Sequence, residues 1–236
     1  MGWFPTQHQL RIRKSRLKAE FHLTDTEEDP RRMVREGYDR IAHRYFFWNL
    51  NDVHNSPAET RFLPMVLHSL PVGARCIDLG CGNGLPYTQT LTKRFKVIAV
   101  DFSMTQLILA RQQVPQAFLL QADITRLHLP AGCLDAAVAL YSIIHIPRET
   151  HASLFRQIAI WLRSGGLFLV ALLKEDLPEY IEDDWLGAPM FWSSHDPATS
   201  VDLIRNAGFE VLDCDIVPQI EDGEQVDFLW VLAKRL

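Results

Sequence analysis

The sequence predicts an α/β fold with a Rossmann-like, doubly wound and mainly parallel sheet. From about residue 75 onward, short apolar segments alternate with segments of helical length. The first apolar segment runs straight into a turn with three glycines, and the next one ends in an aspartate. Strands that alternate with helices form parallel sheets covered on both faces, with right-handed crossovers. We therefore expect a functional site at the carboxyl ends of the strands.

Two helices are expected before the sheet. Apolar and aromatic residues recur at helical spacing in residues 31–47, and these include Tyr38 and Tyr45. A second helix is expected over residues 57–70, where a Pro-Val-Gly turn ends it. Both helices precede the first strand, so they are free to cover an edge or an end of the sheet.

Seven strands with intervening helices form the predicted sheet. Each strand is a short apolar run, and each helix is a longer segment with helical periodicity. The expected strands are Arg75–Leu79, Lys96–Asp101, Ala117–Asp123, Asp135–Tyr141, Leu167–Leu173, Glu210–Val217 and Val226–Ala233. The expected helices between them are Pro86–Lys93, Met104–Gln113, residues 149–163 and residues 198–207.

Residues 174–197 interrupt this alternation with an insertion rich in aromatic residues. A structureless segment of this length is uncommon in a compact domain and often has a function. We interpret it as a lid whose Trp185, Met190 and Trp192 wall a substrate pocket, with His195 as a further candidate to contact the substrate. The alternative is a satellite hydrophobic cluster under a long loop.

Composition limits the domain organisation and the partners. The 236 residues fit one domain, which we expect over residues 31–236, with residues 1–30 as a flexible extension. The formal net charge of −5 gives no general attraction to nucleic acid or to a membrane. The four cysteines lack metal-type spacing, so we expect reduced thiols in a cytoplasmic protein without a bound metal. Composition leaves open whether it is a monomer or a homodimer.

The turn after the first strand has the chemistry of a ligand cradle. Asp78 precedes Gly80, Gly82 and Gly84, and a helix follows them. Glycine permits a positive φ and a close backbone approach, and a helix start offers unpaired N–H groups. In a dinucleotide fingerprint the third glycine falls one residue later, where this chain has Leu85. A carboxylate at Asp78 also suits a cationic ligand better than a pyrophosphate, so S-adenosylmethionine (SAM) is favoured over NAD.

Acidic residues end the next two strands. Asp101 ends the second strand, where a carboxylate can accept hydrogen bonds from both hydroxyls of a ribose. Asp123 ends the third strand, where it can accept from an adenine amino group while the Ile124 N–H donates to a ring nitrogen. Phe102 and Met104 are expected to pack on the adenine. The alternative for both aspartates is a helix or turn cap.

Four segments in order, IDLGCGNG, VIAVDFS, QADI and ALYSIIHIP, resemble the motifs of class I SAM-dependent methyltransferases, most closely the methyltransferase type 11 group. The resemblance covers roughly residues 31–236 and implies a seven-stranded sheet whose last strand is antiparallel. It also implies a SAM-binding set at matching positions. Asp78 and Gly80, with the adjoining Cys81 and Gly82, hold the amino acid end, Asp101 the ribose, and Asp123 with Ile124 the adenine.

Four further residues are candidates on the same resemblance. Tyr38 and Tyr45 match a helix that caps SAM, where they contact the methionyl carboxylate or line the substrate pocket; as aromatics at helical spacing they fit a core equally well. Tyr141 lies at the end of the fourth strand, which faces the methyl group in this fold. His145 follows it and is a candidate general base or substrate orienter, because an unperturbed histidine has a pKa near 6.5. The alternative for His145 is a structural histidine before Pro147.

These observations predict an enzyme that transfers a methyl group from SAM to a small molecule by in-line displacement and releases S-adenosylhomocysteine. Whether the acceptor atom is oxygen, nitrogen, sulfur or carbon is open. Two alternatives are a non-catalytic SAM-binding module and an NAD-dependent oxidoreductase. A nucleic-acid methyltransferase is disfavoured, because the amino-methylating DNA enzymes of this fold carry a Pro-Pro signature where this chain has Ser142-Ile143.

Overall fold

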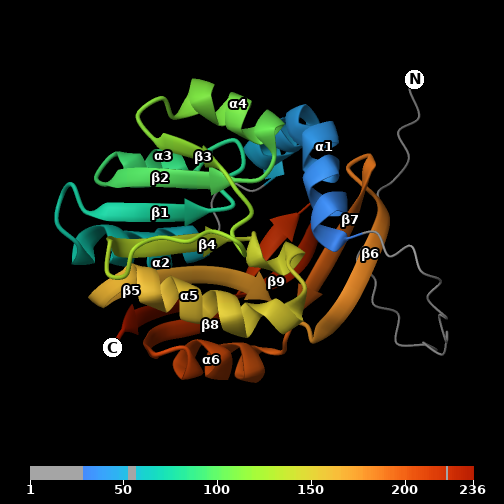
Figure 1. The fold of residues 1–236 in the computed structure, drawn as a ribbon. Coiled ribbons are helices and arrows are strands. Elements are labelled where there is room, and N and C mark those ends of the chain that lie inside the picture. The colour runs from blue at the N-terminus through green and yellow to red at the C-terminus, as the bar shows by residue number, and fades with distance from the viewer. Residues whose placement is uncertain (1–28, 53–56, 222) are drawn as a thin grey trace, which may run out of the picture.

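A seven-stranded sheet lies at the centre of the molecule, in the order β3-β2-β1-β4-β5-β9-β8 (Figure 1). The computed structural model describes residues 29–52, 57–221 and 223–236, so the predicted extension of residues 1–30 lies almost wholly outside the described residues. The strands of the sheet are β1 (Arg75–Leu79), β2 (Lys96–Asp101), β3 (Phe118–Gln121), β4 (Leu134–Leu140), β5 (Leu162–Leu173), β8 (Phe209–Glu221) and β9 (Glu224–Arg235).

The strand directions confirm the predicted doubly wound sheet. β1 pairs in parallel with both β2 and β4, β2 with β3, and β4 with β5. The last strand, β9, lies between β5 and β8 and is antiparallel to both. The carboxyl ends of β1, β2 and β4 therefore meet at one edge of the sheet, where the glycine turn begins.

Helices cover both faces of the sheet, as Figure 1 shows with α5 and α6 in front and α2 behind. Phe155 of α5 packs against Phe168 of β5, and Phe62 of α2 stacks on Trp230 of β9 with ring centroids 5.7 Å apart. The α-helices are α1 (Pro30–Asp52), α2 (Pro57–Ser69), α3 (Tyr87–Thr92), α4 (Met104–Gln113), α5 (His151–Trp161) and α6 (Pro197–Asn206). Two short 3-10 helices, η1 (Ile143–His145) and η2 (Arg148–Thr150), follow β4.

Capping residues fix the starts of two helices. The Ser103 hydroxyl accepts from Gln106 N at 3.2 Å at the start of α4. The Asp196 carboxylate accepts from Thr199 N at 3.0 Å at the start of α6, and Pro197 is the first residue of that helix. Both arrangements satisfy N–H groups that a helix start leaves without an internal partner.

The insertion after β5 is a β-hairpin, which corrects the prediction of a structureless lid. β6 (Leu177–Trp185) and β7 (Ala188–Ser194) are antiparallel, and Trp185 pairs with Ala188. Leu186 and Gly187 form the connection with φ of 53° and 99°. Two consecutive residues with positive φ match the twist of a tight hairpin, which explains how so short a turn joins the strands. β7 is buried along most of its length, whereas β6 is mostly exposed.

The last two strands are longer than the sequence predicts. β8 continues to Glu221 and β9 begins at Glu224, whereas the apolar runs end at Val217 and begin at Val226. The extra residues of the two strands form the end of the β8–β9 hairpin, which extends beyond the apolar core. This extension places Gln219 and Glu221 beside the site described below.

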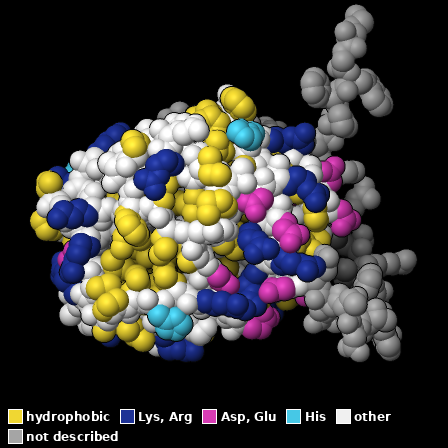
Figure 2. Space-filling view, turned by 45° about the horizontal axis from the view of Figure 1, so that its top comes forward, with side chains coloured by type: hydrophobic (Ala, Val, Ile, Leu, Met, Phe, Trp, Pro, Cys, Tyr) yellow, Lys and Arg dark blue, Asp and Glu magenta, His cyan; other side chains and the backbone are white. Residues whose placement is uncertain are grey.

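None of the helices in the described ranges is both long enough and apolar enough to cross a bilayer. Around the start of α1, basic and acidic side chains alternate on the surface (Figure 2). Arg31 pairs with Asp29 at 3.0 Å, and Arg32 lies 3.9 Å from Glu36. Charges of both signs are therefore interspersed on this face.

We predict that Phe62→Ala lowers the free energy of unfolding by about 3–5 kcal/mol, because Phe62 is fully buried and its loss leaves a cavity against Trp230. Urea denaturation followed by circular dichroism measures it. The control is Phe47→Ala on α1, whose side chain is 61% exposed and whose removal is expected to change stability by less than ~0.5 kcal/mol. Equal losses in the two variants would contradict the packing described for α2.

Candidate functional site

Two adjoining cavities open at the carboxyl edge of the sheet. The first has about 670 Å³ of empty space and the second about 650 Å³, the solvent at their open mouths included. Arg31, Asp101, Phe102, Asp123 and Ile124 line only the first cavity. The second cavity alone is lined by side chains of the hairpin β6–β7 and of the end of β8. The residues on the wall shared by both are Tyr38, Tyr45, Gly80, Gly82, Leu140, Tyr141 and His145.

The glycine turn after β1 forms part of the shared wall. Gly80 has a φ of 79°, and a Cβ at this position would lie 2.3 Å from the Ser142 Cβ. The Ser142 hydroxyl donates to Leu79 O at 2.6 Å, which holds the turn after β4 against the end of β1. Gly82 has a φ of 53° and also faces the cavities. Only glycine fits the close approach at Gly80, so this residue brings the two strand ends together.

Asp101 links the glycine turn to the end of β2. Its Oδ2 accepts from Gly82 N and its Oδ1 from Ser103 N, each at 2.9 Å. Burial raises the pKa of the Asp101 carboxyl to about 6, against the lowering effect of these backbone N–H groups. Each carboxylate oxygen keeps acceptor capacity beside the N–H that it already binds, because a carboxylate offers about four lone-pair sites. Asp101 can therefore accept further hydrogen bonds from a ligand in the first cavity.

Asp78 lies beneath the glycine turn. Its Oδ2 accepts from the Thr88 hydroxyl at 2.6 Å, and the side chain lines neither cavity. Burial raises the pKa of its carboxyl to about 6, partly offset by the Thr88 hydrogen bond. The sequence analysis expects this carboxylate to contact a ligand. In the structure it is buried beneath the glycine turn, which lies between it and the cavities. Cys81 and Asn83 of the turn line the second cavity.

The end of β3 contributes a turn with a capped aspartate. Asp123 Oδ1 accepts from the N–H and the hydroxyl of Thr125, at 2.9 and 2.6 Å. Its Oδ2 lies 3.7 Å from an Arg31 nitrogen of α1 and 3.7 Å from Arg126 Nε, and Asp123 lines the first cavity together with Ile124 and Phe102. The capping hydrogen bonds to Thr125 thus use Oδ1, whereas the ligand-binding interpretation needs Oδ2.

Tyr38 and His145 form a buried hydrogen-bonded pair on the shared wall. Tyr38 Oη lies 2.9 Å from His145 Nε2, and His145 Nδ1 lies 2.8 Å from Phe191 O of β7. A carbonyl only accepts, so Nδ1 carries the proton and Nε2 accepts the Tyr38 O–H. Burial lowers the pKa of His145 to about 4 and raises the pKa of Tyr38 well above 10. Both side chains are therefore neutral at pH 7.

Aromatic rings wall the second cavity. Tyr45 and Trp48 of α1 stack with centroids 5.8 Å apart, and Trp185 and Trp192 of the hairpin meet edge to face at 5.3 Å. Trp185 joins the two groups, at 5.8 Å from Tyr45 and 5.9 Å from Trp48. The prediction for Trp185 and Trp192 therefore agrees with where the structure places them. Tyr45 and Trp48 add a second aromatic wall from a helix far away in the sequence.

Three predicted site residues lie away from the cavities. Met104 is the first residue of α4 and is 47% exposed, so it does not pack on the cavity wall. Met190 is fully buried where β7 packs on α1, close to Gly37. His195 Nε2 lies 3.2 Å from Arg148 O, and its ring contacts His151. Met104, which the sequence predicts at the adenine, and Met190 and His195, which it predicts at the substrate, thus line neither cavity.

The sequence analysis missed the polar end of the second cavity. Gln219 Oε1 accepts from the Tyr141 hydroxyl at 2.7 Å, and Gln219 Nε2 donates to Glu221 Oε1 at 2.8 Å. Tyr141 has a φ of 57°, which is unusual for a residue with a side chain and marks a strained position beside the site. The one signal in the sequence is that polar residues follow directly on the apolar run of β8. Among the described residues, no cluster of three or more histidine, cysteine or acidic side chains is arranged to hold a metal.

The fold and the site share their main features with one class of protein. An antiparallel β9 between β5 and β8, a glycine turn after β1 and an acid at the end of β2 are the features of class I SAM-dependent methyltransferases. Residues 76–166 match the family described as methyltransferase domain, and the fold of the chain is the Rossmann-like methyltransferase fold. The cofactor of this class is SAM.

Several proteins that are similar to this chain in sequence are named as methyltransferases. The chain is 28% identical over 177 residues to 27-O-demethylrifamycin SV methyltransferase of Amycolatopsis mediterranei (strain S699), covering 64% of this chain and 62% of that protein. It is 35% identical over 102 residues to trans-aconitate 2-methyltransferase of Azoarcus sp. (strain BH72), covering 42% of this chain and 39% of that protein. The alignments thus span less than two thirds of these relatives.

Solved structures share the fold. A 1,6-didemethyltoxoflavin-N1-methyltransferase of Burkholderia thailandensis has a TM-score of 0.66 at 19% identity, covering 90% of this chain and 93% of that one. The magnesium protoporphyrin IX methyltransferase of Synechocystis PCC 6803 has a TM-score of 0.67 at 15% identity, covering 90% and 100%. At these identities the likeness concerns the fold alone.

We predict that Asp78→Asn flattens the dependence of stability on pH between about pH 4 and 6. Folding raises the pKa of Asp78 to about 6, so its contribution to stability is complete below its unfolded pKa near 4 and is lost as the pH rises through 6. At pH 7 the variant is expected to be more stable than the wild type by roughly 1–3 kcal/mol, since an asparagine oxygen still accepts from Thr88.

Urea titrations at several pH values measure this difference. Asp202→Asn on α6, an exposed position, is the control and is expected to leave the curve unchanged. If the free energy of unfolding of Asp78→Asn depends on pH from 4 to 7 as that of the wild type does, the Asp78 carboxyl does not titrate in this range, and the prediction is wrong.

Proposed function

We propose that this chain transfers a methyl group from SAM to a small-molecule acceptor and releases S-adenosylhomocysteine. In this proposal SAM binds in the first cavity and the acceptor in the second. One observation carries it: Gly80, Gly82, Tyr38 and His145 belong to the wall that both cavities share. A ligand in each cavity would then meet the other at this wall, as a direct transfer requires.

The residues of the first cavity fit the nucleoside part of SAM. Asp101 offers carboxylate lone pairs to two ribose hydroxyls while its backbone hydrogen bonds keep it in place. Asp123 Oδ2 and the Ile124 N–H match the amino group and a ring nitrogen of adenine, and Phe102 gives an apolar wall.

The charges of the site fit the other end of SAM. Asp78 and Asp101 are the buried carboxylates on either side of the glycine turn. Both favour a ligand that brings positive charge, because an ammonium or sulfonium group stabilises a carboxylate whose burial is costly. The turn residues Gly80, Cys81 and Gly82 approach the ligand with their backbone. Tyr45 and Tyr141 close the cavity over it.

In this proposal the main contribution of the protein is to align the acceptor with the methyl group of SAM. When bound, SAM supplies a methyl group that its sulfonium charge already activates. Holding two reactants in line contributes ~7–11 kcal/mol to a transfer of this kind. The helix α1, which contributes Tyr38 and Tyr45 to the shared wall, packs on β7 of the hairpin. The cytoplasmic location remains a prediction from the sequence.

The Tyr38–His145 pair supports the orienting role of His145 over the role of general base. His145 Nε2 already accepts the Tyr38 hydroxyl, so a substrate proton has no direct access to it. Its pKa of about 4 leaves little driving force to take a proton at pH 7. Because Tyr38 donates to His145, its oxygen lone pairs are left to accept an N–H or O–H of the acceptor. Tyr38 then positions the nucleophile, and His145 positions Tyr38.

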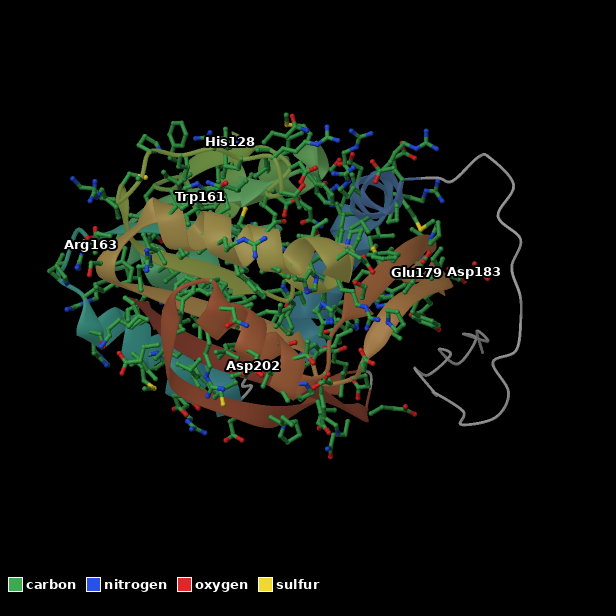
Figure 3. All side chains as sticks on the ribbon, turned by 60° about the horizontal axis from the view of Figure 1, so that its bottom comes forward. His128, Trp161, Arg163, Glu179, Asp183 and Asp202 are labelled. Atoms are coloured by element: carbon green, nitrogen blue, oxygen red, sulfur yellow. The ribbon has the colours of Figure 1, made fainter. Side chains whose placement is uncertain are left out.

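We predict that Asp101→Ala weakens the binding of S-adenosylhomocysteine at least tenfold. The variant removes the acceptor oxygens that face the ribose and the bond that holds Gly82. Isothermal titration calorimetry measures the affinity, and circular dichroism checks that the variant is folded. Asp202→Ala, at an exposed position of α6 that Figure 3 labels, is the control and is expected to bind as the wild type does. Absence of binding by the folded wild type would refute the proposed function.

We predict that Tyr38→Phe lowers kcat about 10- to 100-fold and leaves the affinity for S-adenosylhomocysteine within threefold, because it removes the contact that aligns the acceptor. His145→Asn is expected to act in the same direction through Tyr38. The exposed Tyr180→Phe on β6 is the control. Activity is followed as S-adenosylhomocysteine formed from a metabolite extract.

The nitrogen chemical shifts of His145 test its protonation without an acceptor. The imidazole is expected to stay neutral, with the proton on Nδ1, from pH 7 down to about 5, since its pKa is about 4. If the His145 nitrogen shifts titrate with a midpoint near pH 6.5, and kcat falls with the same midpoint, His145 acts as a general base and the orienting role is wrong.

A further inference from the structure

Three polar side chains line the second cavity beside the glycine turn, and the backbone of Leu85 connects two of them. Asn49 of α1 donates from Nδ2 to Leu85 O at 3.1 Å, and Asn83 Oδ1 accepts the Leu85 N–H at 2.9 Å. Tyr87, the first residue of α3, follows two positions later. All three side chains belong to the second cavity and not to the first. We call the set of Asn49, Asn83 and Tyr87 the turn subsite.

Two oxygen atoms of the turn subsite can accept hydrogen bonds from a ligand. The bond to Leu85 O orients the Asn49 amide, and its Oδ1 has no partner among the described residues. The Tyr87 hydroxyl donates to the Glu59 carboxylate of α2 at 3.0 Å, so its proton is already committed. The Tyr87 oxygen has two lone pairs, and the neighbouring Tyr141 hydroxyl occupies one of them at most.

One nitrogen atom of the turn subsite is a donor without a partner. Asn83 is 1% exposed, and its Nδ2 makes no hydrogen bond within the described ranges of the chain. Its Oδ1 has to face the Leu85 N–H, so the amide cannot turn over to pair its nitrogen instead. A buried donor left unpaired costs free energy, and such groups are rare in folded proteins. An acceptor atom of a ligand at this position would remove that cost.

The turn subsite is built for a neutral group. Its three side chains carry no charge, and neither lysine nor arginine is found among the described residues that line the second cavity. A carboxylate would meet two acceptor oxygens and the charge of Glu59 behind Tyr87, with no cation to offset the cost of its burial. A neutral group that donates two hydrogen bonds and accepts one would pair with all three atoms.

We propose, on the basis of the proposed methyl transfer, that the acceptor carries a primary carboxamide that binds at the turn subsite. The NH2 group donates to Asn49 Oδ1 and Tyr87 Oη, and the carbonyl oxygen accepts from Asn83 Nδ2. A hydroxyl has one proton and serves only one of the two oxygens, whereas a ketone serves neither. The carboxamide matches the subsite in both the number and the kind of its hydrogen bonds.

The carboxamide anchors the acceptor and is not itself methylated. Its nitrogen lone pair is delocalised into the carbonyl, so this nitrogen is a poor nucleophile. The turn subsite also belongs to the second cavity alone, whereas Tyr38 and His145 lie on the wall shared with the first. The methyl group is therefore accepted by a different atom of the same molecule, near Tyr38.

The test uses three probes of nearly equal shape. Indole-3-acetamide, indole-3-acetone and indole-3-acetate carry an NH2 group, a methyl group and a charged oxygen at the same position beside a carbonyl. Calorimetry on protein saturated with S-adenosylhomocysteine is expected to show the carboxamide binding about tenfold more tightly than either of the others. The reason is that the ketone loses two hydrogen bonds and the carboxylate meets acceptors without a cation.

Two variants locate the preference at the turn subsite. Tyr87→Phe removes one acceptor oxygen, so it is expected to lower the ratio of carboxamide to ketone affinity about threefold. Asn83→Ala removes the donor that both carbonyl groups use, so it is expected to weaken the two probes about equally and to keep their ratio. Tyr180→Phe, on the exposed strand β6, is the matched control and is expected to keep the wild-type affinities.

The amino acid end of the cofactor is the competing partner of Asn83, and a second pair of ligands separates the two. 5′-Methylthioadenosine lacks the amino acid end that S-adenosylhomocysteine carries. Asn83→Ala is expected to change both affinities by less than twofold. If it weakens S-adenosylhomocysteine tenfold or more and leaves 5′-methylthioadenosine unchanged, the unpaired N–H belongs to the cofactor and the inference is wrong.

The wild type alone separates this inference from the proposed function. If protein that binds S-adenosylhomocysteine binds none of the three probes, or does not prefer the carboxamide, the inference is wrong and the proposed function stands. If S-adenosylhomocysteine itself does not bind, the proposed function fails first. The comparison of the probes needs no variant, so a variant that does not fold leaves it decisive.

Discussion

The arrangement of the site depends on one buried carboxylate, that of Asp101. Its oxygens accept the backbone N–H of Gly82 in the turn after β1 and of Ser103 at the start of α4. Ser103 in turn donates its hydroxyl to Asp39 of α1 at 2.6 Å. Burial of a carboxylate costs free energy, and these hydrogen bonds offset part of that cost. The same bonds hold the turn, the helix start and α1 in a single arrangement around the first cavity.

The position of Tyr38 follows from that arrangement. Asp39 fixes α1 beside α4, and the preceding residue, Tyr38, then faces His145, which is 107 residues away in the sequence. His145 is held from its other side by Phe191 of the hairpin. Three elements that are distant in the chain thus meet on the wall shared by the two cavities. The hydrogen bonds around Asp101 and the Tyr38–His145 pair are in this way parts of one connected structure.

Local patterns in the sequence predicted the features that local chemistry determines. The strands are apolar runs, and Gly80 and Asp101 stand at strand ends, so both the sheet and the first cavity were predictable. The hairpin β6–β7 was missed, because its strands belong to an insertion whose turn, Leu186-Gly187, carries little signal. Gln219 and Glu221 were missed because their role comes from the length of β8 and not from an apolar run. Which aromatic residues face the cavity depends on packing, and for this reason Trp192 lines it while Met190 lies beneath α1.

Burial of the shared wall has opposite effects on two requirements of catalysis. It removes water from the place where a methyl group would pass, and it strengthens every hydrogen bond there because the local dielectric is low. The same burial lowers the pKa of His145 to about 4, so the histidine cannot be both enclosed and strongly basic. An acceptor whose nucleophilic atom is already neutral at pH 7 needs no strong base before it attacks. For the proposed transfer, the geometry of Tyr38 and His145 therefore favours a reaction that depends on alignment and not on a strong base.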